Sequence, residues 1–210
     1  NNMPSVFMDI AESRGQKINV EMDARSSHTF KMHSERPEMY EHIKSKKWDY
    51  IILQGFSREL SHTPEHMDTA SVPYVKQIID SIYVNNSCTN VLLFMTWGYK
   101  NGFSDREEID SYAKMSDSVQ KGYEYLSNVF ALPIVPVGNV WREVQAKSKI
   151  ELYQEDFQHP SIYGSYLIAY TFYSAIFKAP PLNTALTKKI SKIDAQFLQE
   201  TSYGFVIDNL

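Results

Sequence analysis

The sequence predicts an α/β fold in which helices cover both faces of a mainly parallel sheet, and three short apolar runs carry this prediction. The runs are Tyr50-Ile51-Ile52-Leu53, Val91-Leu92-Leu93-Phe94-Met95 and Ile134-Val135-Pro136-Val137. Continuous apolar runs of this length are typical of strands that are buried on both faces. Segments with helical periodicity separate the runs, which is the pattern of βαβ units.

The other elements follow from caps, chain breakers and apolar spacing. Pro4 to Arg14 is predicted to form a helix that Gly15 ends, and Ile18 to Met22 is predicted to form a strand. Further helices are expected at 38–45, 72–84, 106–130, 140–147 and 161–177, then a helix near 187–199 and an edge strand at 203–207. A chain of 210 residues suits one domain. We therefore expect a single domain over 1–210, with 179–210 as a C-terminal extension packed on it.

Composition narrows the class of protein. The net charge is −4 and no basic stripe is present, so nucleic acid is not an expected partner. No apolar run approaches the ~18 residues of a membrane span. Cys88 is the only cysteine, which rules out an intramolecular disulfide and a zinc site built from several thiolates. The pairs His28/His33 and His62/His66 are interpreted as ordinary surface or loop histidines, so no metal and no cofactor are expected.

Polar and aromatic residues follow the predicted strands. In a parallel sheet, ligands bind beyond the carboxyl ends of the strands. Gln54 and Gly55 follow the run at 50–53, whereas Trp97 and Tyr99 follow the run at 91–95, and Ser27 follows the strand expected at 18–22. We interpret Trp97, Tyr99, Ser27 and Gly55 as candidate substrate-binding residues.

The strongest chemical signal is Asp156-Phe157-Gln158-His159-Pro160-Ser161, followed by Gly164-Ser165-Tyr166. A carboxylate three residues before a histidine can hold one imidazole nitrogen and leave the other free as a general base. Pro160 and Ser161 then open an apolar helix, which fixes the end of this loop. Asp156 and His159 are therefore the predicted catalytic pair.

This block resembles the last conserved block of the SGNH (GDSL-type) hydrolases, in particular a poorly characterised bacterial branch. Trp48-Asp49-Tyr50-Ile51-Ile52-Leu53-Gln54-Gly55, Met95-Thr96-Trp97-Gly98 and Pro136-Val137-Gly138-Asn139-Val140-Trp141 match that branch in the same order. The resemblance covers roughly residues 1–178. It implies a flavodoxin-like three-layer α/β/α sandwich whose first strand and nucleophile turn are absent from these 210 residues.

The resemblance also implies a mechanism. A serine upstream of residue 1 would attack an ester carbonyl, His159 would take its proton, Asp156 would orient His159, and the Gln54 side-chain amide would help to hold the oxyanion. The implied substrate is an O-acyl ester, with acetyl on a carbohydrate preferred, and the implied source is an exported bacterial enzyme. The alternative is a non-catalytic carbohydrate- or ligand-binding module on the same fold.

Overall fold

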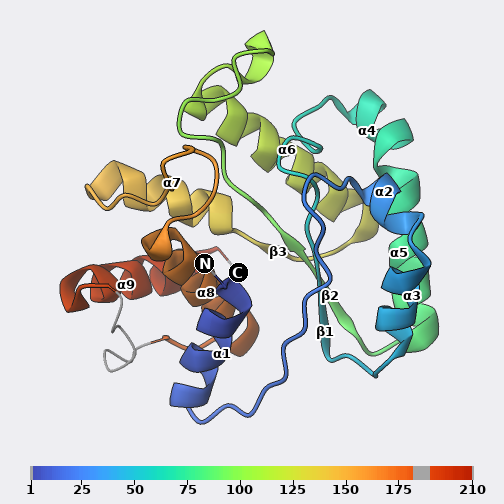
Figure 1. The fold of residues 1–210 in the computed structure, drawn as a ribbon, viewed down its shortest axis with the longest axis horizontal. Coiled ribbons are helices and arrows are strands. Elements are labelled where there is room, and N and C mark those ends of the chain that lie inside the picture. Colours follow the sequence, from blue (N-terminus) through green and yellow to red (C-terminus); the bar gives the residue numbers. More distant parts are fainter. Residues whose placement is uncertain (1, 182–189, 210) are drawn as a thin grey trace. The chain divides into compact units, whose positions relative to one another are not determined.

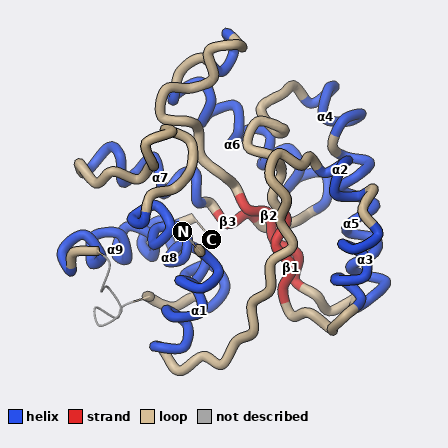
Figure 2. The backbone as a smooth tube through the Cα atoms, in the orientation of Figure 1, coloured by secondary structure: helices blue, strands red, loops and turns tan. Residues whose placement is uncertain are grey.

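The computed structural model describes residues 2–181 and 190–209, and its backbone is largely helical with one short sheet (Figures 1 and 2). The elements in chain order are α1 (Met3–Ser13), α2 (Phe30–Ser34), α3 (Pro37–Lys44), β1 (Tyr50–Leu53), α4 (Pro64–Ala70), α5 (Val72–Asn85), β2 (Asn90–Phe94), the 3₁₀ helix η1 (Glu107–Ile109), α6 (Tyr112–Phe130), β3 (Ile134–Val135), α7 (Val137–Lys147), α8 (Ile162–Phe177) and α9 (Lys192–Asp208). Within these residues, no helix is both long and apolar enough to cross a bilayer.

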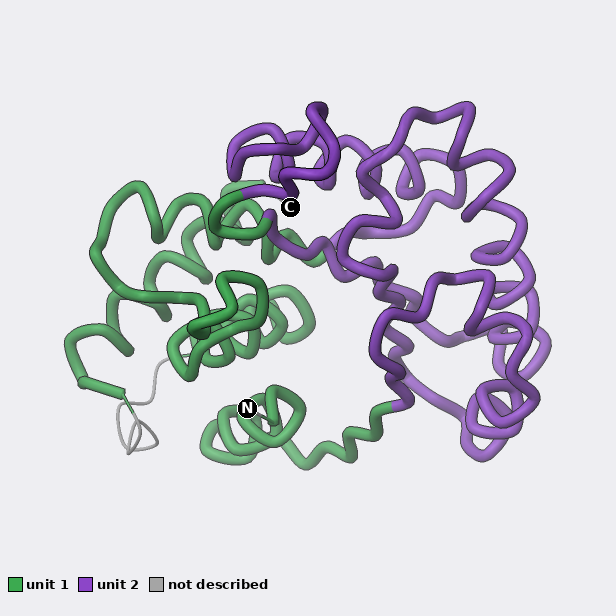
Figure 3. The backbone as a smooth tube through the Cα atoms, turned by 45° about the horizontal axis from the view of Figure 1, so that its top comes forward, with its two compact units in different colours: residues 1–22, 99–101, 135–210 green, residues 23–98, 102–134 purple. Residues whose placement is uncertain are grey.

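The chain divides into two compact units (Figure 3). Unit 1 comprises residues 1–22, 99–101 and 135–210, and unit 2 comprises residues 23–98 and 102–134.

The sheet is parallel and has the strand order β1-β2-β3. Tyr50 lies opposite Asn90 and Leu53 opposite Leu93, so β1 and β2 pair over the whole length of β1. The N–H of Leu93 donates to the carbonyl of Pro133, the residue before β3, at 2.9 Å. The α/β class with a parallel sheet, predicted from three apolar runs, is confirmed.

The prediction that 50–53 is buried on both faces was wrong. Tyr50 is 39% exposed and Ile52 is 37% exposed, whereas Val91 and Leu93 of β2 are at most 2% exposed. The reason is position, because β1 ends the strand order and β2 lies inside it. An apolar run shows that its residues are compatible with burial. It does not show whether the strand is at the centre or at the edge of the sheet.

Unit 1 is built on α8, an apolar helix whose residues from Gly164 to Ser174 are all buried. A helix that is apolar on every side needs partners on every side, and α1, α7 and α9 all pack against it. Ser161 caps its first turn by accepting the N–H of Gly164 at 3.2 Å. Because Ser161 directly follows His159-Pro160, this cap also fixes where the predicted catalytic loop ends.

Two predicted strands of the terminal segments are not strands. Residues 18–22 have no regular secondary structure and no strand partner among the described residues, and Met22 is 65% exposed. Residues 203–207 lie inside α9, which starts at a Ser191 cap and buries Leu198, Ser202 and Val206 along one side. A short apolar run fits either element, and the four-residue spacing of these buried side chains decides for a helix. Of the helix expected near 187–199, residues 187–189 lie outside the described residues.

Proline positions explain two further corrections. His66, interpreted as a surface or loop histidine, lies in α4, whereas His62 lies outside that helix. Pro64 occupies the first turn of α4, and Thr63 caps that turn by accepting the N–H of His66. Proline suits the first helical turn because its missing N–H would have no partner there. Pro136 likewise precedes α7, which begins at Val137. The strand predicted over 134–137 is therefore limited to 134–135, and the helix expected from residue 140 already includes Gly138 and Asn139. The helix expected over 106–130 divides into η1 and α6.

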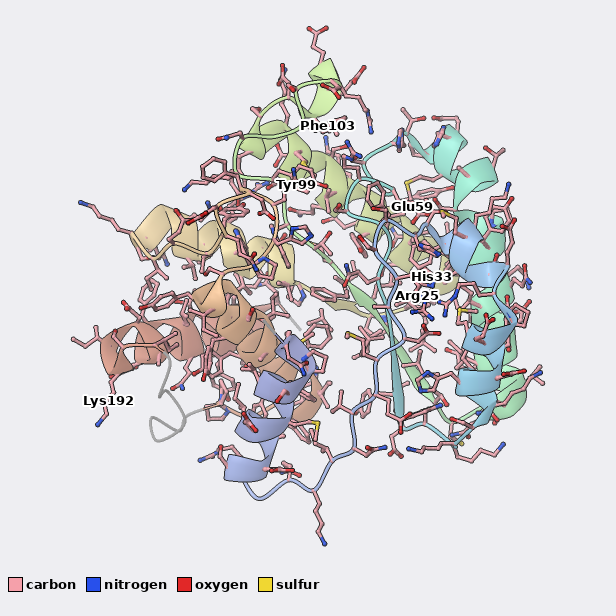
Figure 4. All side chains as sticks on the ribbon, viewed as in Figure 1. Arg25, His33, Glu59, Tyr99, Phe103 and Lys192 are labelled. Atoms are coloured by element: carbon pink, nitrogen blue, oxygen red, sulfur yellow. The ribbon has the colours of Figure 1, made fainter. Side chains whose placement is uncertain are left out.

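A buried carboxyl group joins three segments of unit 2. Glu59 follows β1 and is 8% exposed, and Figure 4 labels it. Its oxygens accept the N–H of Phe30 at 3.0 Å, the N–H of Phe56 at 3.2 Å and the hydroxyl of Ser71 at 3.2 Å. Glu59 therefore holds the start of α2 and the cap of α5 against the loop after β1.

Replacing Glu59 by glutamine is expected to flatten the pH dependence of folding stability. Burial raises the pKa of Glu59 from 4.5 to about 7, against the opposing effect of its three donors. Its stabilising contribution is thus fully present below about pH 4.5 and is lost as the pH rises through about 7, a change of the order of 3 kcal/mol. Urea unfolding at about pH 5 and pH 8 measures it. The exposed Glu12→Gln variant should keep the wild-type slope, and an unchanged slope in Glu59→Gln would contradict the assignment.

Candidate active site

The structure brings Asp156 and His159 together in unit 1. Oδ2 of Asp156 lies 2.6 Å from Nδ1 of His159. Oδ1 of the same carboxylate accepts the backbone N–H groups of Gln158 and His159, both at 2.9 Å. The carboxylate therefore hydrogen-bonds both to the His159 ring and to the backbone of the loop that carries this ring.

The loop from 151 to 161 is fixed by its own backbone. Tyr153 and Pro160 form an antiparallel bridge. The N–H of Gln154 donates to the carbonyl of His159 at 2.8 Å, and the N–H of Ser161 donates to the carbonyl of Leu152 at 2.8 Å. The chain thus doubles back on itself, with Asp156 and His159 on the two sides of its tip. Asp-x-x-His is a common spacing in sequences. In this chain the closed loop brings the two side chains into contact.

Lys100 supports the tip of the loop from a second segment of unit 1. Its N–H donates to the carbonyl of Phe157 at 2.9 Å, and its ammonium group lies 5.2 Å from the Phe157 ring centroid and pairs with Glu151. Phe157 has φ +60°, an uncommon conformation for a side chain of this size. The bond from Lys100 helps to hold that residue in place between Asp156 and His159.

The electrostatics suit a fixed, ionised orienting group. The N–H of Gln158, the His159 ring and the N–H of His159 lower the pKa of Asp156 from 3.8 to about 2. Asp156 is therefore charged at any ordinary pH. The His159 side chain is 71% exposed, and no hydrogen bond to its Nε2 occurs within 2–181 and 190–209. With Nδ1–H donating to Asp156, Nε2 carries the free lone pair of a general base.

Two predicted site residues lie in the loop after β1 in unit 2. Gln54 is exposed. Gly55 is buried, its N–H donates to the Tyr123 hydroxyl at 3.4 Å, and a Cβ at this position would lie 2.9 Å from the Phe30 ring. This packing gives Gly55 a structural reason to be glycine. The oxyanion role of Gln54 and the substrate role of Gly55 stay predictions.

Ser27, Trp97 and Tyr99 lie in different surroundings. Ser27 is exposed at a turn and has φ +59°, so it takes the left-handed conformation that glycine adopts most readily. Trp97 is half-buried, with its ring centroid 6.4 Å from that of Phe94 in unit 2. Tyr99, labelled in Figure 4, belongs to unit 1 and is 8% exposed. Their roles in substrate binding also stay predictions.

The histidine pairs are in contact within unit 2. The rings of His28 and His33 are 5.3 Å apart, and those of His62 and His66 are stacked at 4.2 Å. In the described part of the chain, no group of three or more His, Cys, Asp or Glu side chains is arranged to hold a metal ion.

Sequence reasoning missed a cluster of charged residues in unit 2, which includes Arg58, Glu59 and Arg106. The first two come five and six residues after the end of β1, on the side of the sheet where ligands bind. The charged residues Arg58 and Glu59 shortly after the apolar run at 50–53 were the available signal. Arg106 is far away in sequence, and only the folded chain brings it to this loop.

Comparisons with known proteins place the fold. No model of a protein family matches the sequence, and no curated protein matches it. Solved structures with a similar fold include the following two. A DUF4886 family protein from Bacteroides uniformis has a TM-score of 0.79 at 18% identity, covering 96% of this chain and 88% of its own. A protein from Slackia heliotrinireducens, provisionally described as an SGNH hydrolase, has a TM-score of 0.62 at 19% identity, covering 81% of this chain and 88% of its own.

These likenesses define the class of the fold. The chain has an SGNH hydrolase-like α/β fold, and the resemblance predicted from its motifs is confirmed at this level. Structural similarity at sequence identities below 20% supports a shared fold but not a shared function, because one fold hosts many functions.

Proposed function

We propose that the protein is a serine esterase that hydrolyses an O-acyl ester, with an acetyl group on a carbohydrate as the expected substrate. The observation that carries the proposal is the 2.6 Å contact between Asp156 Oδ2 and His159 Nδ1, with no hydrogen bond to Nε2 from any residue that the structure describes. A carboxylate-oriented imidazole with one free nitrogen is the base half of a Ser-His-Asp triad. The SGNH hydrolase-like fold supports the same reading.

The proposed reaction has two halves. The serine Oγ, upstream of residue 1, attacks the ester carbonyl carbon, and its proton passes to Nε2 of His159. The tetrahedral intermediate then expels the alcohol, which takes that proton, and leaves an acyl-serine. Water attacks the acyl group with His159 again as base, which releases the acid and restores the serine. Asp156 stays ionised throughout and stabilises the imidazolium.

Labelling of the full-length natural protein with a fluorophosphonate probe tests the proposal. We expect one serine upstream of residue 1 to be labelled, as located by peptide mapping. Labelling should be lost in His159→Ala, because the base is gone. It should persist in His42→Ala, whose ring lies on α3 against Trp48.

Two other results would change the proposal. A label on Ser26, Ser27 or Ser57 would keep the esterase but move its nucleophile into the present chain. If the folded full-length protein took up no label and cleaved no p-nitrophenyl acetate, the esterase would be rejected. The ligand-binding module would then be the better account.

A further inference from the structure

Unit 2 contains a pocket of about 650 Å³. It is lined by residues of the loop after β1, of α4 and α5, of the start of α2 and of the loop before η1. A volume of this size holds a ligand of one or two rings. The side chains that matter for its chemistry are Lys31, Arg58, Glu59, His66, Phe103 and Arg106.

Arg58 is held in the pocket by aromatic rings and by no polar group. Its guanidinium carbon lies 3.6 Å from the centroid of Phe103, which Figure 4 labels, and 5.2 Å from that of Phe56. Across the part of the chain that the structure describes, its side chain makes no hydrogen bond and no ion pair. Stacking on a ring orients the planar group while its N–H donors stay available. An oriented guanidinium with unused donors can bind two oxygens of a carboxylate or of a phosphate group.

Two further cations line the same pocket. Lys31 lies with its ammonium group 5.8 Å from the Tyr74 ring centroid and has no ion-pair partner among the described residues. Arg106 is fixed by hydrogen bonds to the Ser61 carbonyl at 2.6 Å and to His62 Nε2 at 3.1 Å. The site therefore combines one anchored arginine with two cations that lack a counter-charge inside it.

His62 adds a hydrogen-bond donor to the pocket and no positive charge at neutral pH. Burial and the charge of Arg106 lower the pKa of His62 to about 4, so this ring is neutral at neutral pH. Because Nε2 of His62 accepts from Arg106, its proton lies on Nδ1. The ring of His66, stacked on His62, makes no hydrogen bond within the described residues.

Glu59 is the only carboxylate that lines the pocket. Its oxygens accept the N–H groups of Phe30 and Phe56 and the Ser71 hydroxyl, so they are already engaged by groups of the protein. Arg106 also lies 4.0 Å from Glu108, which does not line the pocket, so Lys31 and Arg58 are the cations without a counter-charge. Together with Arg106 they outnumber the one engaged carboxyl group and make the pocket electropositive, although the chain as a whole carries −4. A local field opposite in sign to the net charge marks a site for an anion.

We propose that this pocket binds a small organic anion, namely an oxyanion group carried on a body of one or two rings. Arg58 and Lys31 pair with the oxyanion, and the rings of Phe103 and Tyr74 contact the body. The proposal does not rest on the esterase, because it concerns unit 2 residues alone. A carboxylate and a phosphate ester present the same chemistry to Arg58, and the experiment distinguishes them.

Isothermal titration of the full-length protein with sodium glucuronate, glucose 6-phosphate and glucose, at constant ionic strength, tests the site. We expect at least one of the two anions to bind and uncharged glucose not to bind. Arg58→Gln should weaken anion binding about tenfold or more, since a charge-assisted fork is lost. Arg25→Gln is the matched control, because Arg25, labelled beside His33 in Figure 4, does not line the pocket.

Each outcome decides the proposal. Binding of glucuronate alone identifies a carboxylate, and binding of glucose 6-phosphate alone identifies a phosphate ester. If neither anion binds at up to ~10 mM, or if Arg58→Gln and Arg25→Gln weaken binding equally, the site is rejected. If Arg58→Gln lowers the melting temperature, Lys31→Gln replaces it, with a weaker but measurable loss of affinity expected. These results are independent of fluorophosphonate labelling, so a failed esterase and a failed anion site can be told apart.

Discussion

Replacing Asp156 by asparagine is expected to lower kcat for p-nitrophenyl acetate by about 10³- to 10⁴-fold in the full-length protein, with little change in melting temperature. This is the size of effect seen when a triad carboxylate becomes an amide and the histidine takes the wrong tautomer. The measurement is steady-state hydrolysis together with thermal unfolding of the same samples.

The reason lies in how the Asp156 carboxylate divides its two oxygens. Oδ1 accepts two backbone N–H groups, from Gln158 and His159, while Oδ2 accepts one ring N–H. An asparagine keeps its single oxygen on the side with two donors, because that choice satisfies more bonds. Its NH₂ group then faces Nδ1 of His159 and donates to it. The ring proton is forced onto Nε2, so the nitrogen that should accept the serine proton has no free lone pair.

The neighbouring residue provides the control. Glu155→Gln makes the same carboxylate-to-amide change one position away, at an exposed side chain outside the loop's hydrogen bonds. It should keep wild-type kcat within about twofold. A loss of activity of less than about tenfold in Asp156→Asn would remove Asp156 from the mechanism. The low pKa of Asp156, about 2, adds that an acidic limb above pH 3 cannot come from this carboxyl group.

The pairing of Asp156 with His159 was predictable from sequence because the two residues are close along the chain. Their spacing, the following proline and the Ser161 cap together describe one local loop. The anion pocket was not predictable in the same way. Arg58 and Phe103 are separated by 44 intervening residues, and nothing in either segment marks the other as its partner. A site formed by residues that are close in sequence can be predicted from that sequence. A pocket depends instead on which distant segments the fold brings together.

The same dependence on distant segments explains which of the predicted strands were right and which were wrong. Three apolar runs and the helical periodicity between them predicted the parallel sheet and its helices. The strand expected at 18–22 failed because a strand exists only with a partner, and pairing is not a property of its own residues. The strand expected at 203–207 failed because a helix that starts at Ser191 continues through it. Whether a short apolar run forms a helix or a strand thus depends on the residues that flank it.

Replacing Gly122 by alanine is expected to destabilise the protein by about 3 kcal/mol, although alanine normally favours a helix. Gly122 lies in α6, and a Cβ built there would be 1.8 Å from the carbonyl oxygen of Leu60 and 2.9 Å from its Cβ. Leu60 is 1% exposed, and it belongs to the loop that carries Arg58 and Glu59, so the loop after β1 rests directly on the backbone of α6. Relief requires moving backbone and not a flexible side chain, and a fall in melting temperature of about 6–12 °C should follow.

Gly204→Ala is the matched test of that argument. Gly204 is also helical, in α9, but a Cβ there would meet no atom within 4 Å. Alanine should therefore stabilise by about 0.5–1 kcal/mol, because it restricts the unfolded chain and clashes with nothing. Opposite signs for the two substitutions would establish that the loop after β1 is seated on α6 at Gly122. Stabilisation by both substitutions would mean that the loop after β1 does not contact α6 at Gly122. The position of Arg58 and Glu59, and with it the proposed pocket, would then lack support.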